Sequence, residues 1–214
     1  MKSTILLAED HEVLRDGLRS IIEMTDDLEV IAEAADGAEA VAMAQRHRPD
    51  VVVMDIWMPR LSGIEATRKI VDEGRIGKVL IVSQHTRWSY VEQALKAGAL
   101  GYLIKTSSAS NLLTAIRAVC AGKSYLSPEI AHLLVEAVAR PEESFGSPLS
   151  TITTREREVL QLLGEGLSSK EIADVLCVSV RTADAHRASL MNKLDIHKIS
   201  GLVRFAIREG LIAP

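Results

Sequence analysis

The sequence of 214 residues lacks long apolar runs and has only two cysteines, and each scarcity excludes a class of protein. No stretch approaches the roughly 20 apolar residues that are needed to cross a bilayer. The apolar start of the chain lasts about five residues before Glu9 and Asp10, which is too short for a signal peptide. Cys120 and Cys177 lie far apart and lack metal-ligand spacing. We therefore expect free thiols in a reducing cytoplasm and no membrane partner.

An excess of positive charge is also missing. The formal net charge is −4, which for the chain as a whole argues against a nucleic-acid partner. The charge is uneven, however, because residues 150–214 hold nine Lys or Arg against eight Asp or Glu, whereas residues 1–149 hold 16 against 21. Any nucleic-acid contact is therefore expected in the C-terminal part, where it depends on local charge.

What the chain does contain is a short apolar run at residues 51–54 that leads directly into Asp55. A uniformly apolar run of this length is typical of a strand that is buried on both faces of a parallel sheet. Asp55 then stands at the carboxyl edge of the sheet, where open α/β folds place their functional sites. A lone Asp after a strand can also be a turn former, so this position alone does not establish a site.

Three other polar stretches favour the functional interpretation, because each follows an apolar run of its own. They are Glu9-Asp10, Ser83 and Lys105, after the runs at residues 4–8, 78–82 and 101–104. Strand ends gather along one edge of a doubly wound sheet, so these side chains are expected to converge with Asp55. Three carboxylates repel one another unless a cation lies among them, and oxygen ligands suit Mg²⁺. An ammonium and a hydroxyl nearby suit a phosphoryl group, so the pattern predicts that Asp55 is a nucleophile that carries one.

The segments between these runs have the apolar spacing of helices. A further strand is expected at residues 28–34, and helices are expected at 11–24, 38–46, 64–72, 88–97 and 109–121. Five strands that alternate with five helices predict a five-stranded parallel sheet with right-handed crossovers.

The C-terminal part has a different organisation. A helical stretch ends near residue 140, and residues 141–148 contain two prolines, a glycine and two serines, which is typical of a linker. Helices are then expected from Thr153 or Thr154 to about residue 164, with Glu156 or Glu158 completing a capping box, and at 170–176, 180–194 and 198–209. The short turn before Ser179 predicts a helix-turn-helix, although periodicity alone favours a generic helical bundle nearly as well.

The residues themselves resemble two known families. Glu9-Asp10, Asp55, Ser83 and Lys105 stand in the order and at the spacing of the receiver domain of two-component response regulators. Residues 154–160 (TREREVL), 166–173 (GLSSKEIA) and 179–187 (SVRTADAHR), with Lys193-Leu194, resemble the LuxR-type DNA-binding domain. The whole chain is similar to response regulators of the NarL/FixJ family. This resemblance implies a flavodoxin-like receiver over residues 1–125, a linker with a helical first part over 126–148, and a small all-α helix-turn-helix domain over 149–214.

The resemblance also implies roles for residues. Asp55 would accept a phosphoryl group from a partner sensor histidine kinase. Asp10 and Asp55 would bind Mg²⁺ through their carboxylates, Glu9 through water, and Trp57 through its backbone carbonyl. Phosphorylation would promote formation of a homodimer and binding to double-stranded DNA at promoters.

Further roles concern the switch around Asp55. The resemblance implies that Lys105 pairs with phosphate oxygens, that Ser83 hydrogen-bonds the phosphoryl group, and that Tyr102 rotates inward as Ser83 moves. Thr106 stands where many receivers have Pro, which leaves open the cis peptide that is common there. Trp57 is large for its position and is expected to shield the phosphoryl group. His85 could position an attacking water or could be an ordinary exposed histidine.

In the C-terminal domain, the helix at 180–194 is expected to read DNA. The residues that face away from its core side are Arg181, Asp184, Ala185, Ala188 and Asn192. The candidates for phosphate contact are Lys170, Arg181, Thr182, His186 and Arg187. Ala183, Leu190 and Leu194 are expected to face inward. The final helix has a wide apolar stripe, and in the family this helix pairs subunits.

Two alternatives compete with this interpretation. A phosphatase or phosphotransferase of the haloacid-dehalogenase type would also use an Asp nucleophile, but it carries a second acid two residues later, where this chain has Trp57. A regulator that works without phosphorylation would tolerate loss of Glu9, Asp10 or Lys105, and all three are present. We therefore expect no enzyme, beyond slow self-phosphorylation from small phosphodonors and self-dephosphorylation.

Overall fold

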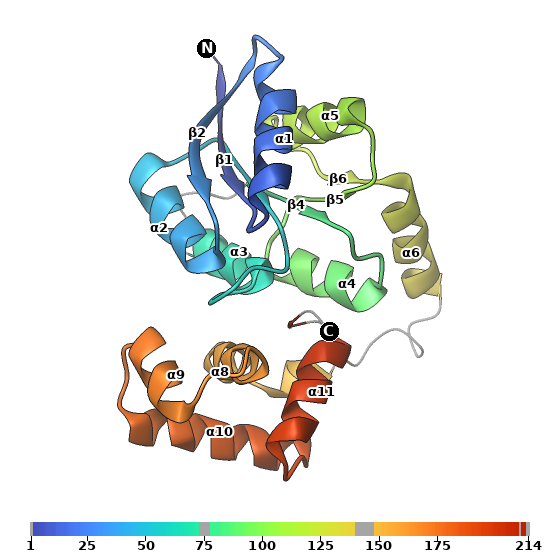
Figure 1. The fold of residues 1–214 in the computed structure, drawn as a ribbon. Helices are drawn as coiled ribbons and strands as arrows, with labels where there is room; N and C mark the ends of the chain where they lie inside the picture. Colours follow the sequence, from blue (N-terminus) through green and yellow to red (C-terminus); the bar gives the residue numbers. More distant parts are fainter. Residues whose placement is uncertain (1, 73–77, 140–147, 210, 213–214) are drawn as a thin grey trace. The chain divides into compact units, whose positions relative to one another are not determined.

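The computed structural model describes residues 2–72, 78–139, 148–209 and 211–212 (Figure 1). The chain divides into two compact units, Met1–Phe145 and Gly146–Pro214. Of the expected linker at 141–148, only residue 148 lies within the described residues. None of the described helices is both long enough and apolar enough to cross a membrane.

The first unit contains a six-stranded parallel sheet with the order β2-β1-β3-β4-β5-β6. The strands are β1 (Ser3–Ala8), β2 (Leu28–Ala34), β3 (Val51–Met54), β4 (Val79–Ser83), β5 (Gly101–Ile104) and β6 (Tyr125–Leu126). The sequence predicted five of these strands and missed β6, which lies at one edge of the sheet. The extra strand has two residues, which pair with Gly101 and Tyr102 of β5.

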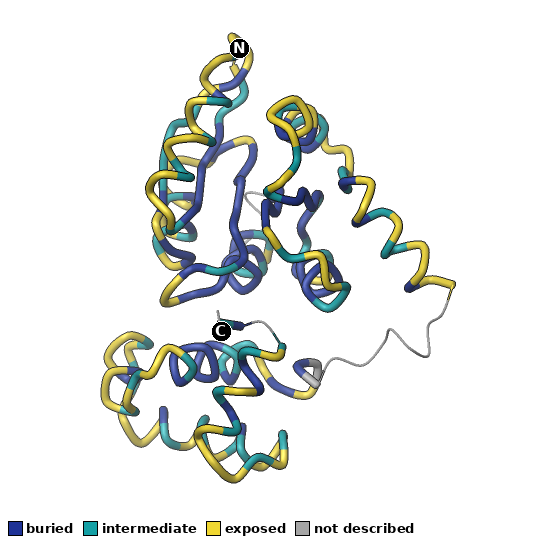
Figure 2. Tube along the Cα trace, turned by 45° about the vertical axis from the view of Figure 1, so that its right-hand side comes forward, coloured by how far each residue is buried: buried dark blue, intermediate teal, exposed yellow. Residues whose placement is uncertain are grey.

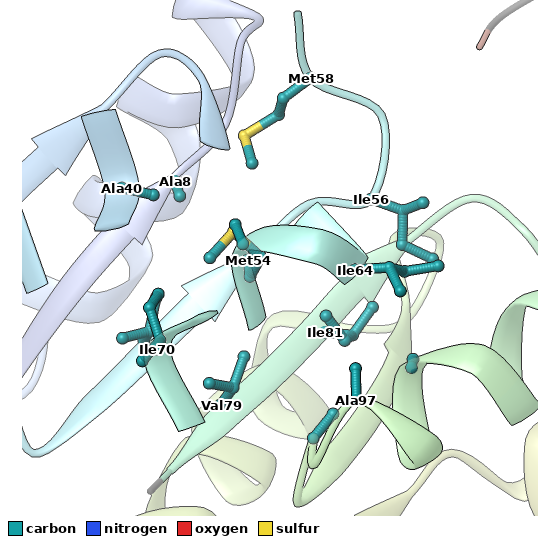
Figure 3. Close-up of a cluster of buried hydrophobic side chains, with 14 of the residues drawn as sticks. Ala8, Ala40, Met54, Ile56, Met58, Ile64, Ile70, Val79, Ile81 and Ala97 are labelled. Atoms are coloured by element: carbon teal, nitrogen blue, oxygen red, sulfur yellow. The ribbon is translucent and has the colours of Figure 1, made fainter. Parts of the chain in front are cut away.

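Helices cover both faces of the sheet, which is why its strands read as continuous apolar runs. The flanking helices are α1 (Glu12–Glu23) and α5 (Ala109–Cys120) on one face, and α2 (Gly37–His47), α3 (Gly63–Asp72) and α4 (Trp88–Lys96) on the other (Figure 1). Successive residues of β1 alternate between the two faces, with Leu6 in one buried cluster and Leu7 in the other. Figure 3 shows part of the first cluster, in which Met54, Ile81 and Ile64 lie between the sheet and its helices. These clusters hold the carboxyl ends of the strands in place.

A further helix, α6 (Pro128–Ala139), belongs to the first unit. Ile130 is fully buried in the core cluster that lies under α4, and Leu133 packs against the same cluster. The backbone N–H of Ser127 donates to the carbonyl of Tyr102 at 3.0 Å, which continues the alignment of β6 with β5. The helical segment that the sequence placed in the linker is thus docked on the receiver.

The second unit is helical. Its elements are the short 3-10 helix η1 (Pro148–Thr151) and the helices α8 (Thr154–Gly164), α9 (Ser169–Val175), α10 (Val180–Leu194) and α11 (Ile199–Glu209). Thr153, rather than Thr154, caps α8, and it forms a capping box with Glu156. A second capping box joins Ser168 to Glu171 at the start of α9. Buried side chains line the inner faces of these helices, while α10 keeps a largely exposed outer face (Figure 2).

Candidate functional site

The carboxyl ends of β1, β3, β4 and β5 are tied together by backbone hydrogen bonds. The N–H of Asp55, which follows β3, donates to the carbonyl of Ala8 at 2.9 Å. The N–H of Lys105, which follows β5, donates to the carbonyl of Ser83 at 2.8 Å. Ser83 is itself the last residue of β4, one residue later than the sequence pattern placed the strand end. The sheet therefore fixes the starting points of the candidate side chains before those side chains interact.

Lys105 joins two of the predicted carboxylates. Its Nζ lies 2.7 Å from Asp55 Oδ2 and 2.7 Å from Glu9 Oε2. No more than 8% of any of these three side chains is exposed. A buried carboxylate is costly without a partner, so the single ammonium compensates two negative charges at once. One net negative charge is left at the site, and that charge favours a cation.

The environment of Asp55 tunes its carboxyl group. Burial first and the charge of Glu9 second raise the pKa of Asp55 to about 6, in spite of the opposing charge of Lys105. Burial alone would lower the pKa of Lys105, but the pairing with Asp55 and Glu9 outweighs burial and raises it. At neutral pH Asp55 is therefore a carboxylate that lies beside an ammonium, and such a carboxylate is a competent oxygen nucleophile.

Asp10, a further predicted metal ligand, follows Glu9 in the sequence, and its carboxylate contacts His11 rather than Lys105. Its Oδ1 is 2.9 Å from Nδ1 of His11, and Glu9 Oε1 is 3.4 Å from the same nitrogen. Among the described residues, Glu9, Asp10 and His11 form a cluster whose ligand atoms all lie within 4.8 Å of one another. Carboxylate oxygens at a buried, net-negative edge are the donors that Mg²⁺ prefers, so Glu9, Asp10 and Asp55 fit this ion. Trp57, whose backbone carbonyl is the expected further ligand, lies two residues beyond Asp55.

Ser83 and Tyr102 contact the segment that follows β4. The Ser83 hydroxyl accepts a hydrogen bond from the N–H of His85 at 3.2 Å, and the Tyr102 hydroxyl donates to the carbonyl of His85 at 2.7 Å. Both side chains are fully buried. Burial raises the pKa of Tyr102, so its hydroxyl is a neutral donor. Tyr102 thus already has the inward position that was expected to follow a movement of Ser83.

The rings of Trp57, His85 and Tyr90 pack together and are here named the aromatic cluster. The ring centroids of Trp57 and His85 are 3.8 Å apart, and those of His85 and Tyr90 are 4.7 Å apart at 29°. Burial lowers the pKa of His85, and the charges of Lys105 and Arg87 lower it further. His85 is therefore a neutral, half-buried ring between two aromatic side chains rather than an exposed loop histidine.

A tight loop closes the site behind Asp55. The N–H of Gly63 donates to the carbonyl of Ile56 at 2.8 Å, and a Cβ added at Gly63 would lie 1.7 Å from the backbone oxygen of Asp55. Only glycine permits this close approach. In the described part of the chain no peptide bond is cis, so the peptide between Lys105 and Thr106 is trans.

The second unit offers a different kind of surface. One side of α10 carries a row of exposed residues at helical spacing, here named the outer stripe: Arg181, Ala185, Ala188 and Asn192. On the opposite side of the helix, the predicted core residues Ala183 and Leu190 are buried, and Leu194 is partly buried. Of the other residues proposed to contact DNA, Lys170 and Thr182 are exposed and His186 is partly buried.

Asp184 and Arg187 of α10 are bound to Ser169 at the start of α9. Ser169 Oγ donates to Asp184 Oδ1 at 2.8 Å, Arg187 Nη1 donates to Ser169 Oγ at 2.9 Å, and Arg187 Nη2 lies 3.1 Å from Asp184 Oδ1. This closed set of contacts is named the Ser169–Asp184–Arg187 triad. Sequence reasoning treated Asp184 and Arg187 as independent DNA contacts and did not single out Ser169.

Glu156 fixes α10 from the other side. Besides its capping contacts with Thr153, it accepts from Ser189 Oγ at 2.6 Å and from Lys193 Nζ at 2.8 Å. Burial alone would raise the pKa of Glu156, but these hydrogen bonds, first those from Lys193 and Ser189, lower it to about 2. One carboxylate thus joins the start of α8 to the end of α10.

His11, Tyr90 and Ser169 also belong to these groups, although they were not predicted from the sequence. His11 directly follows Asp10, so its nearness was open to prediction from the sequence. Tyr90 and Ser169 gave no such signal, because they meet their partners only through the packing of α4 on the sheet and of α9 on α10.

Comparisons with known proteins agree with both halves of this description. Residues 5–117 match the family model of the response regulator receiver domain, and residues 150–206 match that of bacterial regulatory proteins of the luxR family. The chain is 34% identical to the transcriptional regulatory protein DegU of Brevibacillus brevis, over 99% of this chain and 95% of that protein. It is 37% identical to the oxygen regulatory protein NreC of Staphylococcus carnosus, over 97% of this chain and 98% of that protein.

A solved structure of similar length is that of ChrA, a response regulator in a haem-sensing two-component system. It is 34% identical, covers 99% of both chains and has a TM-score of 0.55. The parallel α/β sheet and the helical C-terminal domain are thus found together in a structure of the same overall make-up.

Proposed function

We propose a mechanism for this chain, which belongs to the NarL/FixJ family of two-component response regulators. The chain is therefore a transcription regulator with a receiver domain and a LuxR-type DNA-binding domain. In this mechanism, Asp55 accepts a phosphoryl group from a partner sensor histidine kinase in the cytoplasm. Phosphorylation then promotes formation of a homodimer and binding to promoter DNA.

The observation that carries the proposal is the position of Lys105 between Glu9 and Asp55. A carboxylate oxygen of Asp55 attacks phosphorus of the donor phosphohistidine, so that an O–P bond forms and the N–P bond to the histidine breaks. Lys105 is placed to hold the phosphoryl oxygens as a point charge. Glu9, Asp10 and Asp55, with the backbone carbonyl of Trp57, would hold Mg²⁺. The ion, when bound, neutralises charge on the phosphoryl oxygens.

The new negative charge changes the balance around Ser83. Its hydroxyl accepts from His85 in the present arrangement, and a phosphoryl oxygen would offer the same hydroxyl an acceptor for its proton. A shift of Ser83 and of the segment after β4 would move the backbone carbonyl of His85, which accepts a hydrogen bond from the Tyr102 hydroxyl. This linked set is the proposed bistable element that passes the signal toward residues 149–214.

The proposed DNA surface is α10 with the start of α9. The exposed Arg181, Ala185 and Ala188 would face the major groove, where the alanines can offer apolar contact to a thymine methyl group. Lys170, Thr182, His186 and Arg187 would bind phosphates, and Asp184 borders the same face. Because the outer stripe is poor in donors, part of the specificity is expected from DNA shape and from the spacing of the two half-sites.

Intact-mass measurement after incubation with acetyl phosphate and Mg²⁺ tests the phosphorylation step. We expect one phosphoryl group per chain, and none on Asp55→Asn. The matched control is Asp50→Asn, at an exposed Asp that precedes β3, which should be labelled like the parent chain. Labelling of Asp55→Asn to the same extent would reject Asp55 as the acceptor. An absence of labelling in the parent chain with phosphorylated partner kinase would favour a regulator that works without phosphorylation.

A further inference from the structure

The second unit holds a partly exposed ion pair between Asp184 and Arg187. The side chains of Asp184 and Arg187 are 45% and 34% exposed. Ion pairs with this exposure typically contribute between about 0 and 1 kcal/mol to folding. Here the pair is closed by a third group from another helix, because Ser169 donates to Asp184 and accepts from Arg187. Three contacts among three side chains leave the guanidinium little rotational freedom.

We propose that Asp184 is a positioning residue, which with Ser169 holds the Arg187 guanidinium ready for a DNA phosphate, and that it does not itself read a base. This inference rests on the proposed function of α10 as the DNA-binding helix. Only two of the five N–H groups of Arg187 are used within the triad, so the others are available for a phosphate. A pre-organised cation loses less conformational entropy on binding than a free one.

The chemistry of Asp184 supports this role over base reading. Its Oδ1 already receives both Ser169 and Arg187. A carboxylate that left these partners for a cytosine amino group would release Arg187 from its position and would carry a negative charge toward the phosphates. Arg187 is bound to Ser169, which directly precedes the exposed Lys170 at the start of α9, and two cations at this place are suited to contact with the DNA backbone.

Two substitutions of Asp184 separate positioning from charge. Asp184→Asn and Asp184→Ala remove the same negative charge, but only Asn keeps an oxygen that accepts from Ser169 and Arg187. The affinity of the full-length chain, treated with acetyl phosphate and Mg²⁺, is measured at several salt concentrations on a duplex selected from a random pool and on its single-base variants. We expect Asp184→Asn to bind at least as tightly as the parent chain. We expect Asp184→Ala to bind about three- to tenfold more weakly than Asp184→Asn, equally on all sequences.

The inference also requires that the effect pass through Arg187. Arg187→Ala should weaken binding to all sequences and reduce the slope of log affinity against log salt by about one. In the Arg187→Ala background, Asp184→Asn and Asp184→Ala should be equal. Ser169→Ala should weaken binding in the same direction as Asp184→Ala. Amide hydrogen exchange of α9 and α10 checks that all variants stay folded.

Three outcomes would overturn the inference. Equal tightening by Asp184→Asn and Asp184→Ala would make Asp184 only a repulsive charge. A changed base preference at one or two positions, retained in the Arg187→Ala background, would make Asp184 a reader of bases. If the parent chain binds no duplex from the pool, the inference and the proposed DNA binding are both wrong, whereas the first two results leave DNA binding intact.

Discussion

The ammonium of Lys105 lies 2.7 Å from Asp55 Oδ2, and 8% of each side chain is exposed. The same ammonium is 2.7 Å from Glu9. This geometry gives Lys105 two roles in the account. It balances buried charge while the site has no phosphoryl group, and in the proposed function it would turn toward phosphoryl oxygens once Asp55 is phosphorylated. The first role makes a prediction about stability.

Removal of Lys105 should expose the cost of the buried carboxylates. We expect Lys105→Ala to lower the free energy of unfolding of the first unit by about 3–5 kcal/mol, because two buried anions lose their shared cation. Mg²⁺ should restore part of this loss, and it should stabilise the variant more than the parent chain. Both tryptophans, Trp57 and Trp88, lie in the first unit, so urea unfolding followed by tryptophan fluorescence reports on this unit.

The matched control is Lys123→Ala, at an exposed lysine after α5, which should change stability by no more than about 0.5 kcal/mol. A Lys105→Ala variant as stable as this control, with or without Mg²⁺, would contradict the charge-balancing role.

Gly63 should be intolerant of a side chain. Because a Cβ there would lie 1.7 Å from the carbonyl oxygen of Asp55, we expect Gly63→Ala to destabilise the first unit by about 3 kcal/mol or more and to slow labelling by acetyl phosphate. Gly17→Ala is the control, since a Cβ on that residue of α1 meets no atom within 4 Å. It should stabilise the unit by about 0.5–1 kcal/mol. Unchanged stability of Gly63→Ala would show that the loop is free to move away.

Glu156 makes the stability of the second unit depend on pH. Its pKa is about 2 in the folded chain, below the ordinary value of 4.5. The stabilisation is therefore fully present above about pH 4.5 and is lost as the pH falls toward 2. We expect Glu156→Gln to reduce the stability of the second unit by about 1–3 kcal/mol at pH 7. The difference between variant and parent should shrink below pH 4.5. Amide hydrogen exchange of α8 and α10 measures it.

Glu171→Gln is a sharp comparison for Glu156→Gln. Both glutamates complete a capping box, but only Glu156 also binds Ser189 and Lys193 of α10. Glu171→Gln should therefore cost less, about 0.5–1 kcal/mol, and should leave exchange in α10 unchanged. If the two substitutions changed stability and amide exchange equally, Glu156 would act only as a cap of its own helix.

The aromatic cluster of Trp57, His85 and Tyr90 should set the lifetime of the phosphorylated state. Trp57 lies two residues beyond Asp55 and packs on the ring of His85. We expect Trp57→Ala to shorten the lifetime of phosphorylated Asp55 severalfold, because water gains access to the phosphoryl group. Trp88→Ala, on α4, serves as a control for the loss of an aromatic ring. The decay is followed by intact mass, and a lifetime unchanged by Trp57→Ala would rule out shielding.

The receiver was largely open to prediction from sequence because its signals are local. Each of the strands β1, β3, β4 and β5 is a short apolar run with a chemically distinctive residue, such as Asp55 or Lys105, at or just after its end. Parallel sheets then bring those ends together without further information. The missed strand, Tyr125–Leu126, has two half-buried residues and no run of its own. It exists because β5 offers an edge to pair with, which no local pattern encodes.

Side-chain partnerships were harder to predict. The sequence indicated that residues 128–140 are helical but not that Ile130 enters the receiver core. Asp184 and Ser169 are 15 residues apart and face each other only because α9 packs across α10. Likewise, His85 gains its ring partner Tyr90 through the packing of α4. Such contacts depend on helix crossing and on rotamers rather than on periodicity.

The most direct test of the central claim is the affinity of the full-length chain for a selected duplex at fixed salt, measured by fluorescence anisotropy with and without acetyl phosphate and Mg²⁺. Asp55→Asn is measured in parallel, with light scattering on the same samples to follow mass. The account predicts tighter binding and a shift to dimer mass for the phosphorylated parent chain, and no change for Asp55→Asn. Equal affinity and mass of the parent chain before and after complete phosphorylation of Asp55 would contradict it.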